Sequence, residues 1–237
     1  MRLNRFIAAC GASSRRGADA LIASGRVTVN GKAVTTMGPD IDPEKDIVCL
    51  DGKQLKAETK KVYIMLNKPS GFISACRDDR GRKTVLSLVS EVEERIFPVG
   101  RLDYDTEGLL LLTNDGDFAY RCTHPAHEVE KKYLAIAAGQ LSDASIDALR
   151  TGVMLDGVRT YPAQVEVKKR TQIETHLSIT IHEGRNRQIR RMIEMVGSSV
   201  QYLKRISEGS LKLGDLKSGK WRWLTSDELN RFLKLIE

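Results

Sequence analysis

Five acidic side chains stand close together in the middle of a chain that is basic as a whole. They are Asp103, Asp105, Glu107, Asp115 and Asp117, and Arg101 stands just before the first of them. Clustered carboxylates can act as nucleophiles, work as general acids and bases, or hold metal ions. Because they repel one another and repel phosphate, such a cluster needs a chemical or a structural reason.

Part of the cluster has a structural explanation. Asn114-Asp115-Gly116 is a turn signal, and Asp117 is placed to cap a short helix. No glutamate completes the twelve-residue pattern of a calcium loop. Cys122, His124 and His127 offer zinc three ligands but lack a fourth, whereas the composition alone leaves a two-metal nuclease open.

The acidic segment flanks a short apolar run, residues 109–112, that is too short for a helix and predicts a buried strand. Further strands are predicted for residues 62–66 and for residues 177–181, where apolar and polar side chains alternate. Capping residues and apolar periodicity predict helices over residues 142–152, 189–196 and 227–236. Strands and helices are interspersed without strict βαβ order, so the predicted fold class is α+β.

Residues 1–58 predict a separate small α/β module. Apolar side chains at positions 3, 6, 7 and 10 share one helical face, and Ser13 or Ser14 is placed to cap a second helix that ends at Gly25. Asn30-Gly31 and Asp51-Gly52 are signals for β-hairpin turns. The polar residues 53–61 predict a linker, and residues 62–237 predict the second domain.

Charge is distributed unevenly along the 237 residues, which carry 38 Lys and Arg against 31 Asp and Glu, a net charge of +7. Residues 1–32 hold six basic side chains and one acidic one, and residues 183–205 hold six and two. Arginine suits bidentate phosphate contacts, so two basic clusters in two domains predict one extended RNA held at both ends.

Composition also argues against other classes of protein. No stretch approaches the about 18 uninterrupted apolar residues that a membrane span needs, so we expect no membrane insertion. The four cysteines form no CxxC pair, which is typical of a reducing cytosol and not of a disulfide scaffold or a zinc ribbon. Neither a P-loop nor a dinucleotide glycine motif is present.

The first module resembles an S4 RNA-binding domain. The resemblance rests on residues 2–6, on residues 13–22 with Ser13-Ser14-Arg15-Arg16, and on Gly25-Arg26-Val27-Thr28-Val29-Asn30-Gly31-Lys32. In that family two helices and a hairpin present a basic face to structured RNA. The residues assigned to RNA binding here are Arg2, Arg5, Ser14, Arg15, Arg16, Arg26, Asn30 and Lys32.

Residues 100–116, with Gly100-Arg101-Leu102-Asp103 at their start, resemble the signature of the RsuA/RluB family of bacterial ribosomal RNA pseudouridine synthases. Three more matches lie in order: Asn67-Lys68-Pro69 with Gly71, Glu130-Lys131-Lys132-Tyr133, and residues 183–192. With the S4-like module the resemblance covers essentially the whole chain. It implies a catalytic domain with a mixed, largely antiparallel central sheet flanked by helices.

The resemblance implies a role for each matched position. Asp103 matches the aspartate that attacks the flipped target uridine, so that the C1′–N1 bond breaks and the uracil rejoins through C5. Tyr133 matches a tyrosine that stacks on the base, Arg190 the basic residue paired with the aspartate, and Ile189 an apolar pocket neighbour. Arg101 is a candidate to fill the gap that the flipped nucleotide leaves. RNA contacts in this domain are predicted for Lys68, Arg101, Arg185, Arg187 and Arg191.

The resemblance extends to substrate and partners. Residues 185–192 and 219–229 look more like members acting on 23S large-subunit rRNA than like the 16S branch. Isomerisation gains and loses no atoms, so we expect no cofactor and no metal. We expect a cytoplasmic monomer whose partner is ribosomal RNA. The alternatives are a 16S rRNA enzyme and a non-catalytic S4-type ribosome assembly factor.

Overall fold

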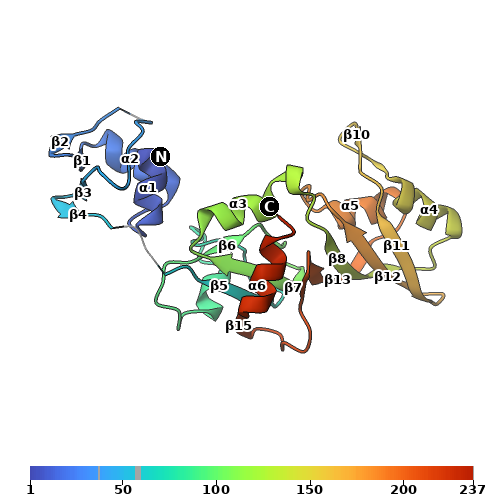
Figure 1. Cartoon of the computed structure of the whole chain (residues 1–237). Coiled ribbons are helices and arrows are strands. Elements are labelled where there is room, and N and C mark those ends of the chain that lie inside the picture. Colours follow the sequence, from blue (N-terminus) through green and yellow to red (C-terminus); the bar gives the residue numbers. More distant parts are fainter. Residues whose placement is uncertain (37, 57–59, 237) are drawn as a thin grey trace. The chain divides into compact units, whose positions relative to one another are not determined.

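The computed structural model describes residues 1–36, 38–56 and 60–236. The chain forms two compact units, Met1–Val62 with Asn114–Gly116, and Tyr63–Thr113 with Asp117–Glu237 (Figure 1). The predicted end of the first domain at residue 58, residues 57–59 of the predicted linker and the last residue of the second domain lie outside the described residues. None of the described helices combines the length and the apolar character that a bilayer crossing requires.

The first unit packs two helices against a small antiparallel sheet of order β2-β1-β3-β4. Its elements are α1 (Leu3–Ala9), α2 (Arg15–Ala23), β1 (Val27–Val29), β2 (Lys32–Ala33), β3 (Val48–Leu50) and β4 (Lys53–Gln54). The hydroxyl of Ser14 accepts a 3.0 Å hydrogen bond from the Gly17 N–H and so caps α2. Both predicted hairpin turns are present, with φ of 52° at Asn30 and 49° at Asp51.

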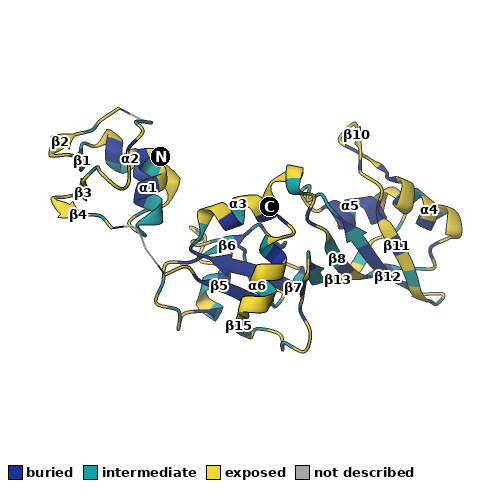
Figure 2. Ribbon diagram, in the orientation of Figure 1, coloured by how far each residue is buried: buried dark blue, intermediate teal, exposed yellow. Residues whose placement is uncertain are grey.

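The prediction that a linker starts at residue 53 is wrong. Lys53 and Gln54 form β4 and pair with β3, because the turn at Asp51 folds the backbone back into hydrogen-bonding register whatever the polarity of the side chains. The apolar faces of α1 and α2 pack inward with Val27 and Val48, which leaves part of the opposite face of α2, with Arg15 and Arg16, exposed (Figure 2).

The second unit is built on one mixed sheet of order β11-β12-β8-β13-β7-β5-β15. Its strands are β5 (Tyr63–Lys68), β6 (Phe97–Val99), β7 (Glu107–Thr113), β8 (Lys131–Ala138), β11 (Gln164–Arg170), β12 (Glu174–Ile181), β13 (Val200–Glu208), β14 (Leu211–Lys212) and β15 (Trp221–Trp223). Neighbouring strands pair antiparallel except β13 and β7, which run parallel. The expected mixed, largely antiparallel sheet is therefore confirmed.

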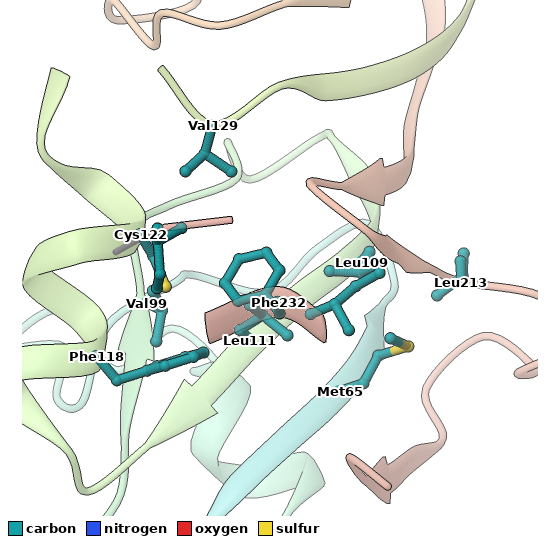
Figure 3. Packing of buried hydrophobic residues seen from close by; sticks show 11 residues of the cluster. Met65, Val99, Leu109, Leu111, Phe118, Cys122, Val129, Leu213 and Phe232 are labelled. Atoms are coloured by element: carbon teal, nitrogen blue, oxygen red, sulfur yellow. The ribbon is translucent and has the colours of Figure 1, made fainter. Parts of the chain in front are cut away.

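Helices and short turns complete this unit. They are α3 (Gly116–Thr123), α4 (Asp143–Thr151), α5 (Gln188–Met195), α6 (Ser226–Leu233), the 3₁₀ turns η1 (Val85–Leu88) and η2 (Pro125–His127), and the hairpin of β9 (Met154–Leu155) and β10 (Val158–Arg159). Thr225 and Glu228 form a capping box at α6. Phe118 of α3 and Phe232 of α6 pack in one hydrophobic cluster with Leu111 of β7 (Figure 3).

Strands β7 and β13 approach each other closely at Gly108. Its φ is +105°, and a Cβ built there would lie 2.1 Å from the carbonyl oxygen of Arg205. Only glycine fits such a contact without moving the backbone. The close approach brings Arg205 next to the segment that follows the predicted nucleophile.

Candidate active site

A pocket of about 660 Å³ opens in the second unit beside the acidic segment. Its wall is formed by the turn before β7, the end of α3, strands β8, β12 and β13, and the loop between β12 and α5. Lys68, Arg190 and Arg191 are not among its lining residues. The predicted site residues that line it are Arg101, Asp103, Tyr133, Arg185, Arg187 and Ile189.

Tyr133 projects from β8 and is buried, with 8% of its surface exposed. In the sheet it stands opposite Ile179 of β12 on one side and Arg205 of β13 on the other. Burial raises the pKa of the Tyr133 hydroxyl, while the charge and a hydrogen bond of Arg205 act in the opposite direction. The phenol is therefore neutral near pH 7 and lies beside a buried cation.

Arg205 and Glu208 form a buried ion pair at the wall of the pocket. Their side chains are 3% and 2% exposed, and 3.2 Å separates Nη2 of Arg205 from Oε2 of Glu208. The Nε–H of Arg205 also donates a 2.7 Å hydrogen bond to the carbonyl oxygen of Leu109. Burial lowers the pKa of Arg205, but the neighbouring Glu208 and Tyr133 raise it by more. The pKa of Arg205 therefore lies above its ordinary value, and the guanidinium stays charged.

Sequence reasoning counted Arg205 only as part of a basic cluster and missed Glu208. The two-residue period of a strand places Arg205 on the same face as the buried Leu203. A register shift between Arg205 and Ser207 then returns Glu208 to that face. The two-residue period of β13 can be seen in the sequence, whereas its register shift depends on the pairing with β8.

Lys68 corrects one expectation. Its side chain is fully buried and does not line the pocket, so it is not placed for the predicted RNA contact. The ammonium donates hydrogen bonds of 2.8–3.1 Å to the carbonyl oxygens of Thr106, Asp103 and Pro69. Burial lowers its pKa to about 8, against the charges of Asp105, Asp103 and Glu107. Lys68 thus fixes the backbone around Asp103 from the protein interior and not from the pocket.

We predict that Lys68→Met lowers kcat by roughly tenfold to hundredfold with little change in KM, because small displacements of reacting groups are costly. In the wild type the ammonium loses its proton above about pH 8. A neutral amine donates one hydrogen less to these carbonyls, so kcat should fall as pH rises through that value. Pre-steady-state rates between pH 6.5 and 9.5 test both effects. A variant with the rate and the pH profile of the wild type would contradict this role.

Arg190 is buried behind the acidic segment, and its partner differs from the expected one. One nitrogen, Nη2, lies 3.2 Å from Oδ2 of Asp105 and also donates to the carbonyl of Asp105 and to the Thr106 hydroxyl. Arg187 approaches the same carboxylate at 3.5 Å. The family resemblance implied a pair with Asp103, but no ion pair to Asp103 occurs among the described residues. The carboxylate of Asp105 thus forms ion pairs with both arginines. Asp103 is half-buried and lines the pocket.

Two predicted RNA-binding arginines tie the β9–β10 hairpin to the rest of the unit, Arg185 from the loop after β12 and Arg191 from α5. The guanidinium of Arg185 donates to the carbonyl oxygens of Val158 and Arg159 at 3.0 and 2.9 Å. Arg191 pairs with Asp156 in the hairpin turn at 2.6 Å. Arg101 is exposed and lines the pocket. Among these three, Arg101 has the placement that an RNA contact requires.

In the first unit, Arg15, Arg16 and Lys32 are exposed, as an RNA-binding face requires. Several other predicted contacts have partners within the unit. Arg26 forms a bidentate pair with Asp51 at 2.9 and 2.5 Å, and Arg2 lies 3.8 Å from Asp40. These partners, the cap at Ser14 and two hydrogen bonds of the Asn30 amide stabilise the module itself.

The zinc alternative meets a clear obstacle at its first ligand. The Cys122 side chain is 1% exposed and packs in the hydrophobic cluster with Val99 and Phe118 (Figure 3). The rings of His124 and His127 lie edge to face with centroids 6.2 Å apart. Within residues 1–36, 38–56 and 60–236, no three His, Cys, Asp or Glu side chains are grouped to hold a metal ion.

Comparison with known proteins agrees with this geometry. The model of the RNA pseudouridylate synthase family matches residues 62–195, and the S4 domain model matches residues 1–38. Ribosomal large subunit pseudouridine synthase B of Bacillus subtilis (strain 168) is 43% identical over 241 residues, covering 100% of this chain and 97% of that protein. An uncharacterized RNA pseudouridine synthase of Aquifex aeolicus (strain VF5) is 42% identical over 237 residues, covering 100% of this chain and 95% of that protein.

A solved structure extends the likeness to three dimensions. The crystal structure of a pseudouridylate synthase superposes with a TM-score of 0.70 at 31% identity, covering 98% of this chain and 99% of that one. The matched family segment contains Asp103, Tyr133 and Ile189, the three side chains that the pocket brings together. The chain therefore belongs to the RNA pseudouridylate synthase family, with an S4 domain preceding its catalytic domain.

Proposed function

We propose that this enzyme converts one uridine of 23S ribosomal RNA to pseudouridine, with Asp103 as the nucleophile. The observation that carries the proposal is that Asp103, Tyr133 and Ile189 line one pocket whose rim is basic. The 43% identity to a large-subunit enzyme, over the whole chain, favours 23S over 16S rRNA as the substrate. We place the reaction in the cytoplasm with the ribosomal RNA, and we expect the enzyme to act as a monomer.

The chemistry conserves every atom of the uridine. The ionised carboxylate of Asp103 attacks the nucleotide, and the C1′–N1 bond breaks. The freed uracil turns within the pocket, and C5 forms the new bond to C1′. The bond between the Asp103 carboxylate and the nucleotide breaks, which returns the carboxylate to its starting state. C5 then loses its proton and N1 gains one, so the product is an isomer of the substrate. The reaction requires neither an electron carrier nor an activated group donor.

The pocket suits a nucleotide that has left its stack. Extrusion of a base costs a few kcal/mol, and an aromatic face can recover part of that cost. Tyr133 offers such a face at the wall of the pocket, which Ile189 also lines. Its neutral hydroxyl also gives a proton donor and acceptor near the sugar. Arg101, at the exposed rim, is placed to enter the gap left in the RNA.

The 23S assignment is tested by carbodiimide mapping of pseudouridine in rRNA from a deletion strain, with and without the wild-type gene. We expect one uridine of 23S rRNA to be marked only in the complemented strain. A mark in 16S rRNA would reassign the substrate, and no difference in any rRNA would favour the assembly-factor alternative. RNA cleavage that stops on EDTA treatment would point to a nuclease instead.

We predict that Arg15→Ala/Arg16→Ala weakens RNA binding and reduces its salt dependence. Both side chains are exposed on α2, and removing two phosphate contacts lowers the slope of log K against log salt by roughly 1 to 2. Filter binding of 23S rRNA fragments between 50 and 300 mM KCl, about the range where such slopes are resolved, measures the effect. Lys45→Ala/Lys53→Ala removes the same charge from exposed positions of this unit as a control. Equal slopes in both double variants would remove α2 from the RNA-binding face.

A further inference from the structure

Tyr161 is an exposed aromatic side chain at the rim of the catalytic pocket, outside the residues assigned a role so far. Its side chain lines the pocket although 57% of its surface is exposed. Its ring lies against the ring of His182, with centroids 4.8 Å apart and planes inclined by 52°. The Nε2 atom of His182 is buried and makes no hydrogen bond to any described residue, so its ring contributes here by stacking.

The backbone at Tyr161 is firmly anchored. Its N–H donates a 2.9 Å hydrogen bond to Oε1 of Glu183, which also accepts a 2.6 Å bond from the Gln188 amide. The other oxygen of Glu183 pairs with Nε of Arg185 at 3.0 Å, and Arg185 in turn binds the β9–β10 hairpin. A ring on an anchored backbone loses little freedom when a flat ligand stacks on it.

The surroundings of Tyr161 select the chemistry of that ligand. Arg187 and Arg101 line the same pocket, and Val158, whose carbonyl oxygen accepts a hydrogen bond from Arg185, is 58% exposed. Exposed aromatic and apolar side chains interleaved with arginines suit unpaired nucleotides, whose bases stack and whose phosphates are anionic. Because the cavity is continuous from Asp103 to Tyr161, one strand can occupy both places.

We infer that Tyr161, backed by His182, stacks on an unpaired base of the RNA next to the target uridine and thereby selects which uridine enters the pocket. The inference rests on the proposed function, since it assumes an RNA strand in this pocket. The stack adds binding energy in both the ground state and the transition state. It therefore acts on KM and on the choice of site and leaves the chemical step alone.

The chain offers a matched control in Tyr120 of α3. This tyrosine is 59% exposed and also lies 4.8 Å from a histidine ring, that of His124, but it is not among the residues that line the pocket. Tyr161→Leu and Tyr120→Leu thus each remove an exposed ring that lies against a pocket-lining histidine, and only Tyr161 lines the pocket itself. Tyr161→Phe keeps the ring and removes only the hydroxyl.

The test measures kcat and KM for 23S rRNA transcripts with wild type and the three variants. Loss of one base stack corresponds to about a tenfold rise in KM for Tyr161→Leu, with kcat unchanged. Tyr161→Phe and Tyr120→Leu should stay within about twofold of wild type, since neither removes the stack. A KM unchanged in Tyr161→Leu, or raised equally in Tyr120→Leu, would overturn the inference.

A second measurement separates stacking from general damage. Once the modified uridine is mapped, RNAs with an abasic nucleotide on either side of it are compared with intact RNA. One abasic RNA should raise KM about tenfold for wild type and cause no further rise for Tyr161→Leu. Additive losses on both RNAs would contradict the stacking contact. If wild type forms no pseudouridine, the proposed function itself fails, which is a distinct result.

Discussion

Replacing Asp103 by asparagine should abolish pseudouridine formation while leaving RNA binding intact. The amide has nearly the shape of the carboxylate but is not a nucleophile, and loss of a nucleophile typically costs a factor of 10⁴ or more, about 5 kcal/mol or above of transition-state stabilisation. Asp103 lines the pocket and is half-buried, and Arg187 and Arg190 pair with Asp105 instead. The substitution therefore leaves no arginine without its partner, and the fold should be unaffected.

Two measurements check this expectation. Carbodiimide mapping of rRNA from the deletion strain should show the uridine modified with wild type and unmodified with Asp103→Asn. Filter binding should give equal affinities for the two proteins. Asp79→Asn makes the same change of charge at an exposed position outside the pocket lining, and it should modify the uridine normally. Restoration of the modification by Asp103→Asn would exclude Asp103 as the nucleophile.

Replacing Arg205 by methionine should destabilise the catalytic unit by about 3–5 kcal/mol, the usual cost of leaving one charge of a buried pair uncompensated. Glu208 is 2% exposed, and Arg205 is the ion-pair partner that the structure gives it. The variant also leaves the carbonyl oxygen of Leu109 without its 2.7 Å hydrogen bond. The double variant Arg205→Met/Glu208→Met removes both charges and should recover much of the loss, because the stranded carboxylate is gone.

Urea unfolding followed by tryptophan fluorescence measures these differences, since both tryptophans lie in β15 of the catalytic unit. Arg222→Met is the control, because Arg222 and Glu228 form an Arg–Glu pair at 2.7 Å that is partly exposed. Removing that arginine should cost at most about 1 kcal/mol. Equal losses for Arg205→Met and Arg222→Met, or a double variant no more stable than Arg205→Met, would contradict the assigned role of the buried pair.

The elements with local signals were predictable. Asn30-Gly31 fixes its hairpin through two left-handed residues, and Ser142 caps α4 by accepting a hydrogen bond from the Ser145 N–H. Residues 109–112 were predicted as a buried strand and are at most 1% exposed within β7. Each of these outcomes depends on a few neighbouring residues. Strand β8 begins with two lysines, and charged residues interrupt the apolar pattern of β13, so the places of both strands follow only from pairing across the sheet.

The same division holds in the candidate site. The residues expected to line a pocket from their motifs, Asp103, Tyr133 and Ile189, do line one. The partners of Lys68 and Arg190 were not predictable, because both side chains reach segments distant in sequence. Lys68 contacts backbone 35 residues away, and Arg190 contacts backbone 85 residues away. Lys68 was predicted to contact RNA, while the fold buries its side chain completely.

The buried pair of β13 has a consequence for how the sheet assembles. A slip of one residue in the pairing of β13 would turn its inner face outward. Lys204 and Ser207 would then point to the buried side of the sheet, where Leu203 now packs. Arg205 and Glu208 would no longer meet across the register shift between Arg205 and Ser207. A misaligned sheet would thus bury the ammonium of Lys204 without a partner, at a cost of several kcal/mol. We therefore expect the Arg205–Glu208 pair to favour the one register of β13 in which the pocket has its complete wall.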